Sequence, residues 1–361
     1  MLSNNEALHL IPSMEFFEQS VDLWMGFASG HMGPQMYQHH TGVRGKQSLS
    51  GVYTWDEHAK WGSLPNLCRT SLNTYLPEVA KAAEKGLPIV EFGPGGLHEA
   101  KKLIEAFHCK EYKPVDCSLE IYDMASQFAK TNNDCRVNPI IADFFSGDNG
   151  AFVDSPALGV QLGSTISNIP GPVPALLPHH HLVQALKNLI KTIPFGGQLF
   201  IQVDTCQDEK RNVAFYSEPW HKLFGVNHIY RMAEELPMNN FDPNGFEYFP
   251  IWHQSCSLLA HTVRAVQDQE FQMGILGEIN VRVKKGEIFH YNNSYKYPSD
   301  FFEACAAEAG LTLISKWGDE VLLYLFDVPA VSCNSQTISK RFLASAISHK
   351  KNDAAGSRII R

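Results

Sequence analysis

The chain has 361 residues, which is long for one hydrophobic core, so we expect two lobes or one domain with a substantial insertion. Hydrophobic residues make up 44% of the chain and charged residues only 19%, which excludes a disordered protein. The formal net charge of −8 disfavours nucleic acid and favours a small ligand. No apolar run approaches the roughly 18 residues of a membrane span, and no secretory pattern opens the chain. We therefore expect a cytoplasmic protein that contacts no membrane, with a monomer favoured.

Cysteine and histidine patterns argue against a metal centre. The eight cysteines are scattered and form no Cys-x-x-Cys pair, which predicts reduced thiols. The runs His39-His40 and His179-His180-His181 have no carboxylate three or four residues away. Adjacent histidines point in different directions and rarely share one ion. We interpret them as surface or helix-start residues and predict no metal.

The N-terminal part of the chain is less regular than the rest. We predict an amphipathic helix over residues 14–27 with Ser13 as its N-cap, followed by irregular structure over residues 29–69. From residue 72 onward, helical and strand patterns alternate. The predicted elements are helix 74–85, strand 87–92, helix 97–107, strand 111–115, helix 119–130, strand 137–141, strand 157–162, helix 180–193, strand 197–203, helix 299–309 and strands 311–316 and 320–326.

This alternation predicts an α/β protein with a parallel sheet covered by helices on both faces. The alternation is lost between residues 207 and 293, where a helical region around 210–236 precedes strand-like runs at 256–265 and 275–283. We expect a Rossmann-like fold with a second α+β substrate-binding lobe. The predicted division is an N-terminal segment 1–69 that contributes to the substrate lobe, a core 70–206, a substrate lobe 207–294, a return to the core over 295–328 and a tail 329–361.

A glycine loop is the strongest local signal. The run from Ile89 to Gly96 reads Ile-Val-Glu-Phe-Gly-Pro-Gly-Gly, a strand that enters a turn and then a helix. Glycines such as Gly93 and Gly95 allow positive φ angles and let the backbone approach a ligand closely. The helix that follows offers free amide donors to an anionic group. A glycine-rich loop alone is weak support, because many α/β turns look similar.

Two acids at successive strand ends strengthen the ligand hypothesis. Asp116 closes the second strand, about twenty residues past the glycines, where an acid would bind ribose hydroxyls. Asp143 closes the next strand and is followed by Phe144. A carboxylate there can accept the amino proton of adenine while the ring packs on the base. Either acid alone is an ordinary loop residue, but the pair predicts an adenosine site.

The turn after the fourth strand offers polar groups at the same edge. It runs from Leu162 to Asn168 and reads Leu-Gly-Ser-Thr-Ile-Ser-Asn. Gly163 permits close approach, and Asn168 provides both donors and an acceptor for a zwitterionic substrate. Residues of these types are also common in plain turns.

These motifs together resemble the histidine-specific Nα-methyltransferases of ergothioneine biosynthesis. The likeness covers about residues 87–326, and its most specific part is the 162–168 turn. The resemblance implies S-adenosylmethionine (SAM) as the cofactor and methyl transfer to an amine as the reaction. The further matching runs are Glu91 to Gly95, Pro114 to Asp116, Asp143-Phe144, Arg231 to Leu236, Asn239 to Asp242, Gly245 to Glu247 and Ser294 to Tyr297.

Site residues follow from the resemblance position by position. It implies that Asn168 and Tyr216 hold the amino and carboxylate groups of a small amine or amino-acid substrate, and both are our candidate catalytic residues. It places Ser294 beside the substrate side chain. The predicted cofactor contacts, including two glycines chosen for close approach, are Gly93, Gly95, Asp116, Asp143, Phe144 and Gly163.

Three departures from the family pattern bear on the substrate. Histidine-specific members have an acid where this chain has Asn292, and a methionine where it has His261. A lysine of the family corresponds to Glu99. An amide cannot provide the charged acceptor that an imidazole N–H prefers, a loss of roughly 1–3 kcal/mol. Asn292 and His261 are therefore candidate substrate-binding residues that argue against histidine itself as the acceptor.

Other functions stay open. We expect direct in-line transfer to a neutral amine, with Tyr216 or water as candidate proton acceptors. The same fold could instead transfer the aminocarboxypropyl chain of SAM, or bind SAM and an amino acid without turnover. An NAD-dependent dehydrogenase is disfavoured, because the loop lacks the third, helix-packing glycine of the dinucleotide pattern.

Overall fold

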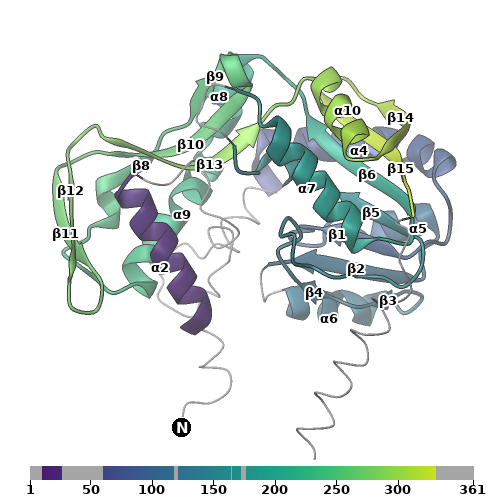
Figure 1. The fold of residues 1–361 in the computed structure, drawn as a ribbon, viewed down its shortest axis with the longest axis horizontal. Coiled ribbons are helices and arrows are strands. Elements are labelled where there is room, and N and C mark those ends of the chain that lie inside the picture. Colours follow the sequence, from purple (N-terminus) through teal and green to yellow (C-terminus); the bar gives the residue numbers. More distant parts are fainter. Residues whose placement is uncertain (1–9, 27–59, 118–120, 164, 172–175, 331–361) are drawn as a thin grey trace, which may run out of the picture. The chain divides into compact units, whose positions relative to one another are not determined.

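The computed structural model describes residues 10–26, 60–117, 121–163, 165–171 and 176–330 (Figure 1). Every element below belongs to one structural unit, Met1–Pro329. Within the described residues, no helix has the length and apolar character needed to cross a membrane.

An eight-stranded sheet forms the centre of the fold, in the order β14-β15-β6-β5-β1-β2-β3, with β4 also paired to β2. Neighbouring strands from β6 through β1 to β3 and β4 run parallel. Only β15 runs antiparallel, to both β6 and β14. This sheet confirms the predicted α/β class. Its strands are β1 (Ile89–Phe92), β2 (Glu111–Asp116), β3 (Arg136–Val137), β4 (Ile140–Ile141), β5 (Ala157–Gln161), β6 (Gly197–Asp204), β14 (Thr312–Trp317) and β15 (Val321–Val328).

Helices cover both faces of this sheet because its central strands are apolar on both sides. On β1, Ile89 and Val90 are both fully buried but enter different cores, as alternate residues of a strand must. Val90 packs with α7 (His179–Thr192) and α10 (Ser299–Glu308). Ile89 packs on the opposite face with α4 (Ser63–Ala82), α5 (Ala100–Phe107) and α6 (Ile121–Thr131).

A second group of elements lies beside the large sheet (Figure 1). It contains a four-stranded antiparallel sheet, β13-β10-β8 with β9 on β10, and a three-stranded sheet, β12-β11-β7. Trp24 anchors its core against Phe246, with ring centroids 4.9 Å apart. The remaining elements are α2 (Leu10–Trp24), η2 (Thr165–Ser167), α8 (Glu209–Tyr216), α9 (Pro219–Glu235), β7 (Met238–Asn239), η3 (Pro243–Gly245), β8 (Phe246–Tyr248), β9 (Ile251–His253), η4 (Gln254–Cys256), β10 (Leu258–Ala265), β11 (Gln269–Met273), β12 (Ile279–Val283) and β13 (Ile288–Tyr295).

All strands of the large sheet come from the predicted core segments 70–206 and 295–328, and the antiparallel strands come from 238–295. Residues 1–9, 27–59 and 331–361 lie outside the described residues, and the predicted division of the chain stays a prediction. The same holds for the predicted surface position of His39-His40.

Several element boundaries differ from the predictions. Helix α2 begins at Leu10, so Ser13 lies inside the helix and is not its N-cap. Helix α4 begins at Ser63 and not at residue 74. Pro65 is compatible with this start, because it lies in the first turn, where the N–H has no intrahelical partner. The expected strand 275–283 begins only at Ile279, after a turn with glycines of positive φ.

Candidate active site

The carboxyl ends of the parallel strands meet at one edge of the large sheet. Strand pairing sets Phe92 beside Val115 and Asp116 beside Ile141. The loops that begin at Gly93 and Ala142 therefore leave the sheet on either side of the end of β2. Sequence reasoning expected ligand-binding groups at this edge.

A cavity of about 580 Å³ opens along this edge, and we call it the larger cavity. Its size lies in the range of small-molecule sites. All the predicted cofactor residues line it, together with His180 and His181 from the start of α7. The predicted residues among its lining are Gly93, Gly95, Asp116, Asp143, Phe144 and Gly163.

Glycine is needed at Gly93 for two reasons. Its φ of +66° is a conformation that residues with a side chain rarely adopt. A Cβ there would also lie 3.3 Å from Cγ2 of Thr165 and 3.4 Å from Cζ of Phe144. Gly163 has a φ of +67° and no atom within 4 Å of a built Cβ, so its backbone borders open space. The loop thus leaves room for a ligand directly against the main chain.

The two acids differ in their surroundings. Burial raises the pKa of Asp143, although the backbone N–H of Phe145 donates to its carboxylate at 3.0 Å. Asp116 accepts from the Cys117 thiol at 3.6 Å. The pKa of Cys117 lies well above its ordinary value, first because of burial and then because both carboxylates lie nearby. Asp116 and Asp143 therefore face one region of the larger cavity.

A second cavity of about 170 Å³ lies against the antiparallel strands, and we call it the smaller cavity. Side chains from β10, β13 and α8 line it on one side, and β1 and the 162–168 turn line it on the other. All the predicted substrate-binding residues line it, namely Asn168, Tyr216, His261, Asn292 and Ser294.

The two cavities share part of their lining. Asn168 and Thr165 belong to both, as do Gly93 and Gly163. Phe224 of α9 also borders both cavities. A group held in one cavity therefore lies next to a group held in the other, with Asn168 between them.

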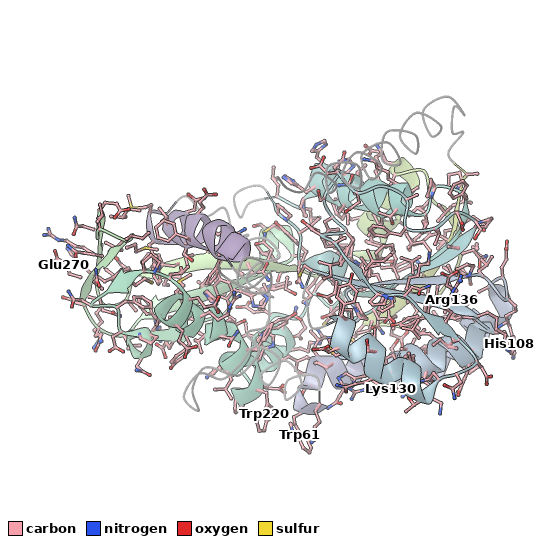
Figure 2. The ribbon with its side chains drawn as sticks, turned by 90° about the horizontal axis from the view of Figure 1, so that it is seen from below. Trp61, His108, Lys130, Arg136, Trp220 and Glu270 are labelled. Carbon is pink, nitrogen blue, oxygen red and sulfur yellow. The ribbon has the colours of Figure 1, made fainter. Side chains whose placement is uncertain are left out.

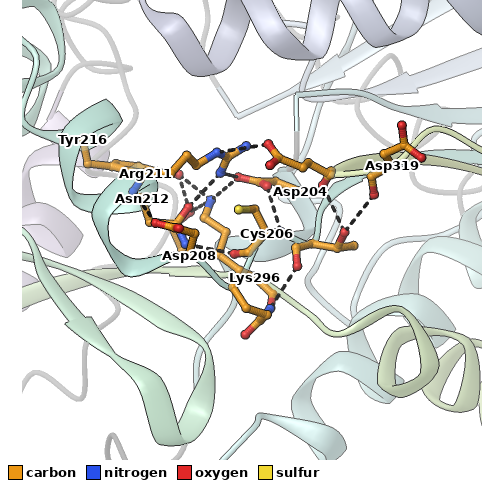
Figure 3. A network of polar contacts seen from close by, with 12 residues as sticks. Asp204, Cys206, Asp208, Arg211, Asn212, Tyr216, Lys296 and Asp319 are labelled. Carbon is orange, nitrogen blue, oxygen red and sulfur yellow. Dashed lines mark hydrogen bonds and ion pairs between the residues drawn. The ribbon is translucent and has the colours of Figure 1, made fainter.

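Tyr216 belongs to a buried polar network that includes Lys296, Arg211 and Asp204 (Figure 3). The Tyr216 hydroxyl and Oγ of Ser294 are 2.7 Å apart, and Nζ of Lys296 donates to them at 2.7 and 3.1 Å. Lys296 also pairs with Asp204 at 3.1 Å, and Nη1 of Arg211 lies 2.8 Å from the same carboxylate oxygen. Lys296 and Asp204 are both fully buried.

Both ions of the buried pair keep their charge. Burial acts to lower the pKa of Lys296, but the Asp204 carboxylate more than offsets this and raises it. Burial acts to raise the pKa of Asp204, while Lys296 and Arg211 bring it below its usual range. Sequence reasoning missed both residues. Asp204 carried the same signal as Asp116, an acid at the end of a buried strand, and Lys296 stood in the quoted run Ser294 to Tyr297.

Histidines and aromatic rings form the wall around His261. Nδ1 of His261 and the Tyr248 hydroxyl are 2.8 Å apart. The His221 ring stacks on His261 with centroids 5.6 Å apart, and the Tyr216 ring meets His261 edge-on at 5.2 Å. Asn292 lies across from His261 in the β10–β13 pair. Within the described lining, this end of the cavity has no carboxylate where the family pattern has one.

Glu91 is another residue of the smaller cavity that sequence reasoning left without a role. Its carboxyl is buried and accepts a hydrogen bond from the Tyr112 hydroxyl. Burial raises the pKa of Glu91 to about 7, even though the Tyr112 bond acts to lower it. Glu99, a departure from the family pattern, also lines this cavity and pairs with Lys102 at 2.7 Å and Arg69 at 3.4 Å.

Hydrogen bonds join the first residue of α4 to Glu218, the residue that precedes α9. Glu218 accepts from the backbone N–H of Ser63 at 2.9 Å and from the Ser63 hydroxyl. Trp61 lies close to Ser63 in the sequence and Trp220 lies close to Glu218. Both rings are exposed and project on the same side of the molecule (Figure 2). The bond therefore joins two helices that each line the cavity, through Leu64 and Phe224.

Histidines do not form a metal cluster in the described part of the chain. There, no three His, Cys, Asp or Glu side chains gather in a way that could hold an ion. His179 begins α7 and its Nε2 lies 3.0 Å from Glu308.

Comparisons with known proteins identify the family of this chain. Residues 69–327 match the family model described as histidine-specific methyltransferase, SAM-dependent, and the chain belongs to this family. It is a SAM-dependent methyltransferase, as the sequence predicted. The chain is also similar to an uncharacterized protein, y4iF, of Sinorhizobium fredii (strain NBRC 101917 / NGR234), at 27% identity over 65% of this chain and 78% of the relative.

Solved structures with a similar trace have low sequence identity. A SAM-dependent methyltransferase from Clostridium acetobutylicum ATCC 824 has 12% identity and a TM-score of 0.41, covering 72% of this chain and 91% of its own. The PH0226 protein from Pyrococcus horikoshii OT3 has 12% identity and a TM-score of 0.42, covering 76% and 98%.

Proposed function

We propose that this enzyme transfers the methyl group of SAM to the amine of a small amino-acid-like substrate. The observation that carries the proposal is the wall shared by the two cavities, at which Asn168 borders both. We also propose a cytoplasmic location, since no disulfide joins the cysteines in the described part of the chain and unbridged thiols are typical of a reducing compartment.

The larger cavity suits the cofactor. The glycine backbone at Gly93 leaves space that a side chain would fill. Asp116 would bind the ribose hydroxyls, and Asp143 with Phe144 would bind adenine through a hydrogen bond and ring packing. When bound, SAM supplies an electrophilic methyl group on a positively charged sulfur.

The smaller cavity suits the acceptor. In this proposal the Asn168 amide oxygen accepts a hydrogen bond from the substrate amine. This bond directs the lone pair of the amine nitrogen toward the wall that the two cavities share. Tyr216 binds the carboxylate together with Ser294, which the family resemblance instead places beside the side chain but whose Oγ lies 2.7 Å from the Tyr216 hydroxyl. His261 and Asn292 contact the side chain. Alignment of this kind can supply roughly 7–11 kcal/mol of the barrier reduction.

The amine must lose its proton before transfer. Glu91 lines the smaller cavity, and its pKa of about 7 suits a group that takes a proton near neutral pH. Tyr216 has a different part in this proposal, because its hydroxyl is already bonded to Ser294 and Lys296. We therefore assign the proton to Glu91, with water as the alternative acceptor.

The test is a turnover experiment with labelled SAM. The protein is incubated with the common amino acids and their decarboxylated amines, and products are identified by mass spectrometry. We expect a methylated amino acid and one S-adenosylhomocysteine for each methyl group transferred. Methylthioadenosine would instead indicate aminocarboxypropyl transfer, and cofactor binding without any consumption would indicate a non-catalytic binding protein.

A further inference from the structure

Lys296 cannot touch a ligand directly, because it is fully buried and all its donors are in use. An ammonium group has three N–H donors. In this structure they point to the carboxylate of Asp204, the hydroxyl of Tyr216 and the hydroxyl of Ser294. Any effect of Lys296 on a substrate must therefore pass through the two hydroxyls.

The hydroxyls of Tyr216 and Ser294 together offer one hydrogen-bond donor to the cavity. Each oxygen accepts a hydrogen bond from Lys296, and the two oxygens are 2.7 Å apart. One hydroxyl must donate to the other, so the second hydroxyl keeps its proton for another acceptor. Tyr216 and Ser294 both line the smaller cavity, and that is where this proton is available.

Charge makes this donor strong. The ammonium group of Lys296 bonds directly to both hydroxyls, and its positive charge is held by the buried Asp204 carboxylate, while Arg211 is shared between Asp204 and Glu320. Hydrogen bonds next to an ionised group are stronger than neutral ones, above all when the acceptor is an anion. Low solvent exposure preserves the effect, because Tyr216 and Ser294 are only 4% and 3% exposed.

We propose that Lys296 is a positioning residue that turns Tyr216 and Ser294 into one charge-assisted hydroxyl donor for the carboxylate of the acceptor. This inference rests on the proposed function, since it assumes an amino-acid-like substrate in the smaller cavity. It adds a residue that contacts no substrate and yet sets the preference for a free carboxylate over a neutral group.

Arg211 provides a matched control. Lys296→Met and Arg211→Met each remove one cation from the same oxygen of Asp204, so both variants should lose stability. Only Lys296 contacts the hydroxyls of Tyr216 and Ser294. A purely structural lysine would therefore act like Arg211. Should Lys296→Met fail to fold, the double variant with Asp204→Asn removes both buried charges together.

The experiment measures binding of the common L-amino acids by calorimetry, each as the free acid and as its methyl ester, with S-adenosylhomocysteine present. For the wild type we expect the free acid of the preferred amino acid to bind about 10- to 100-fold more tightly than the ester. Lys296→Met should bring this ratio close to one, and Arg211→Met should keep it. Unfolding temperatures are recorded for each variant.

Two results would overturn the inference: equal binding of acid and ester by the wild type, or an unchanged ratio in Lys296→Met. Methyl transfer is measured separately by mass spectrometry, and it tests the proposed function independently of the role of Lys296. A carboxylate preference that depends on Lys296, without any methylated product, would support the inference and reject N-methylation. A methylated product without a carboxylate preference that depends on Lys296 would support N-methylation and reject the inference.

Discussion

Asn292 of β13 lies directly opposite His261 of β10, next to the irregular register between His261 and Thr262. Both side chains are buried and both line the smaller cavity. The pair therefore borders one side of the proposed acceptor site with an amide group and an imidazole group. Histidine-specific relatives are expected to have an acid and a methionine at these positions.

Asn292→Glu should raise activity toward histidine. The new carboxylate would accept an imidazole N–H, and a hydrogen bond to a charged group is worth roughly tenfold or more in kcat/KM. Asn280→Glu is the control, because it makes the same change at an exposed position of β12. The measurement is kcat/KM with histidine for the wild type and both variants. No gain in Asn292→Glu would mean that the side chain of the substrate lies elsewhere.

Gly93→Ala should abolish most of the cofactor affinity. Alanine at a φ of +66° is strained, and its Cβ would crowd Thr165 and Phe144 at the larger cavity. Gly86→Ala is the control, since Gly86 has a φ of +78° and no atom within 4 Å of its Cβ. Both variants should lose about 1–2 kcal/mol of unfolding free energy.

Calorimetry with S-adenosylhomocysteine separates the two glycine variants. We expect affinity to fall by about tenfold or more, or 1.4 kcal/mol, in Gly93→Ala and to stay near the wild-type value in Gly86→Ala. Equal affinity in both variants would show that the cofactor does not approach Gly93.

The parts of the fold that were predictable from the sequence are those with a local signal. The run before Gly93 is the buried strand β1, Asp116 ends β2, and Asp143 follows the short strand β4, and pairing then brings them to one edge. Short strands such as β8 and β9 were missed, because three residues have no measurable period. Helix α4 was placed too late, because its first residues adjoin a stretch rich in glycine, histidine and aromatic residues that has no clear period.

The buried network shows a different limit of sequence reasoning. Asp204 ends β6, whereas Lys296 follows β13 of the antiparallel sheet. Their contact at 3.1 Å depends on how the two sheets meet, which no local pattern encodes. A lone lysine between two tyrosines is most often exposed. Only the tertiary structure shows that Lys296 is buried beneath Tyr216.

Glu91→Gln should make stability less sensitive to pH. The pKa of Glu91 is about 7 in the folded protein, compared with an ordinary value of 4.5. The folded state therefore holds this proton more tightly, and the associated stability is fully present below pH 4.5 and lost as the pH rises through 7. Between pH 4.5 and 8.5 the wild type should lose roughly 3 kcal/mol relative to Glu91→Gln. Urea unfolding at several pH values measures the difference.

The same variant tests the proposed proton acceptor. If Glu91 takes the proton of the amine, kcat of the wild type rises with pH through about 7, because the carboxylate form is the active one. Glutamine keeps the shape and can still accept from Tyr112, but it cannot take a proton. Glu91→Gln should therefore have a kcat lower by about 100-fold and no inflection near pH 7. A variant with wild-type kcat and an unchanged profile would assign the proton to water, and Glu91 would then be a buried structural acid.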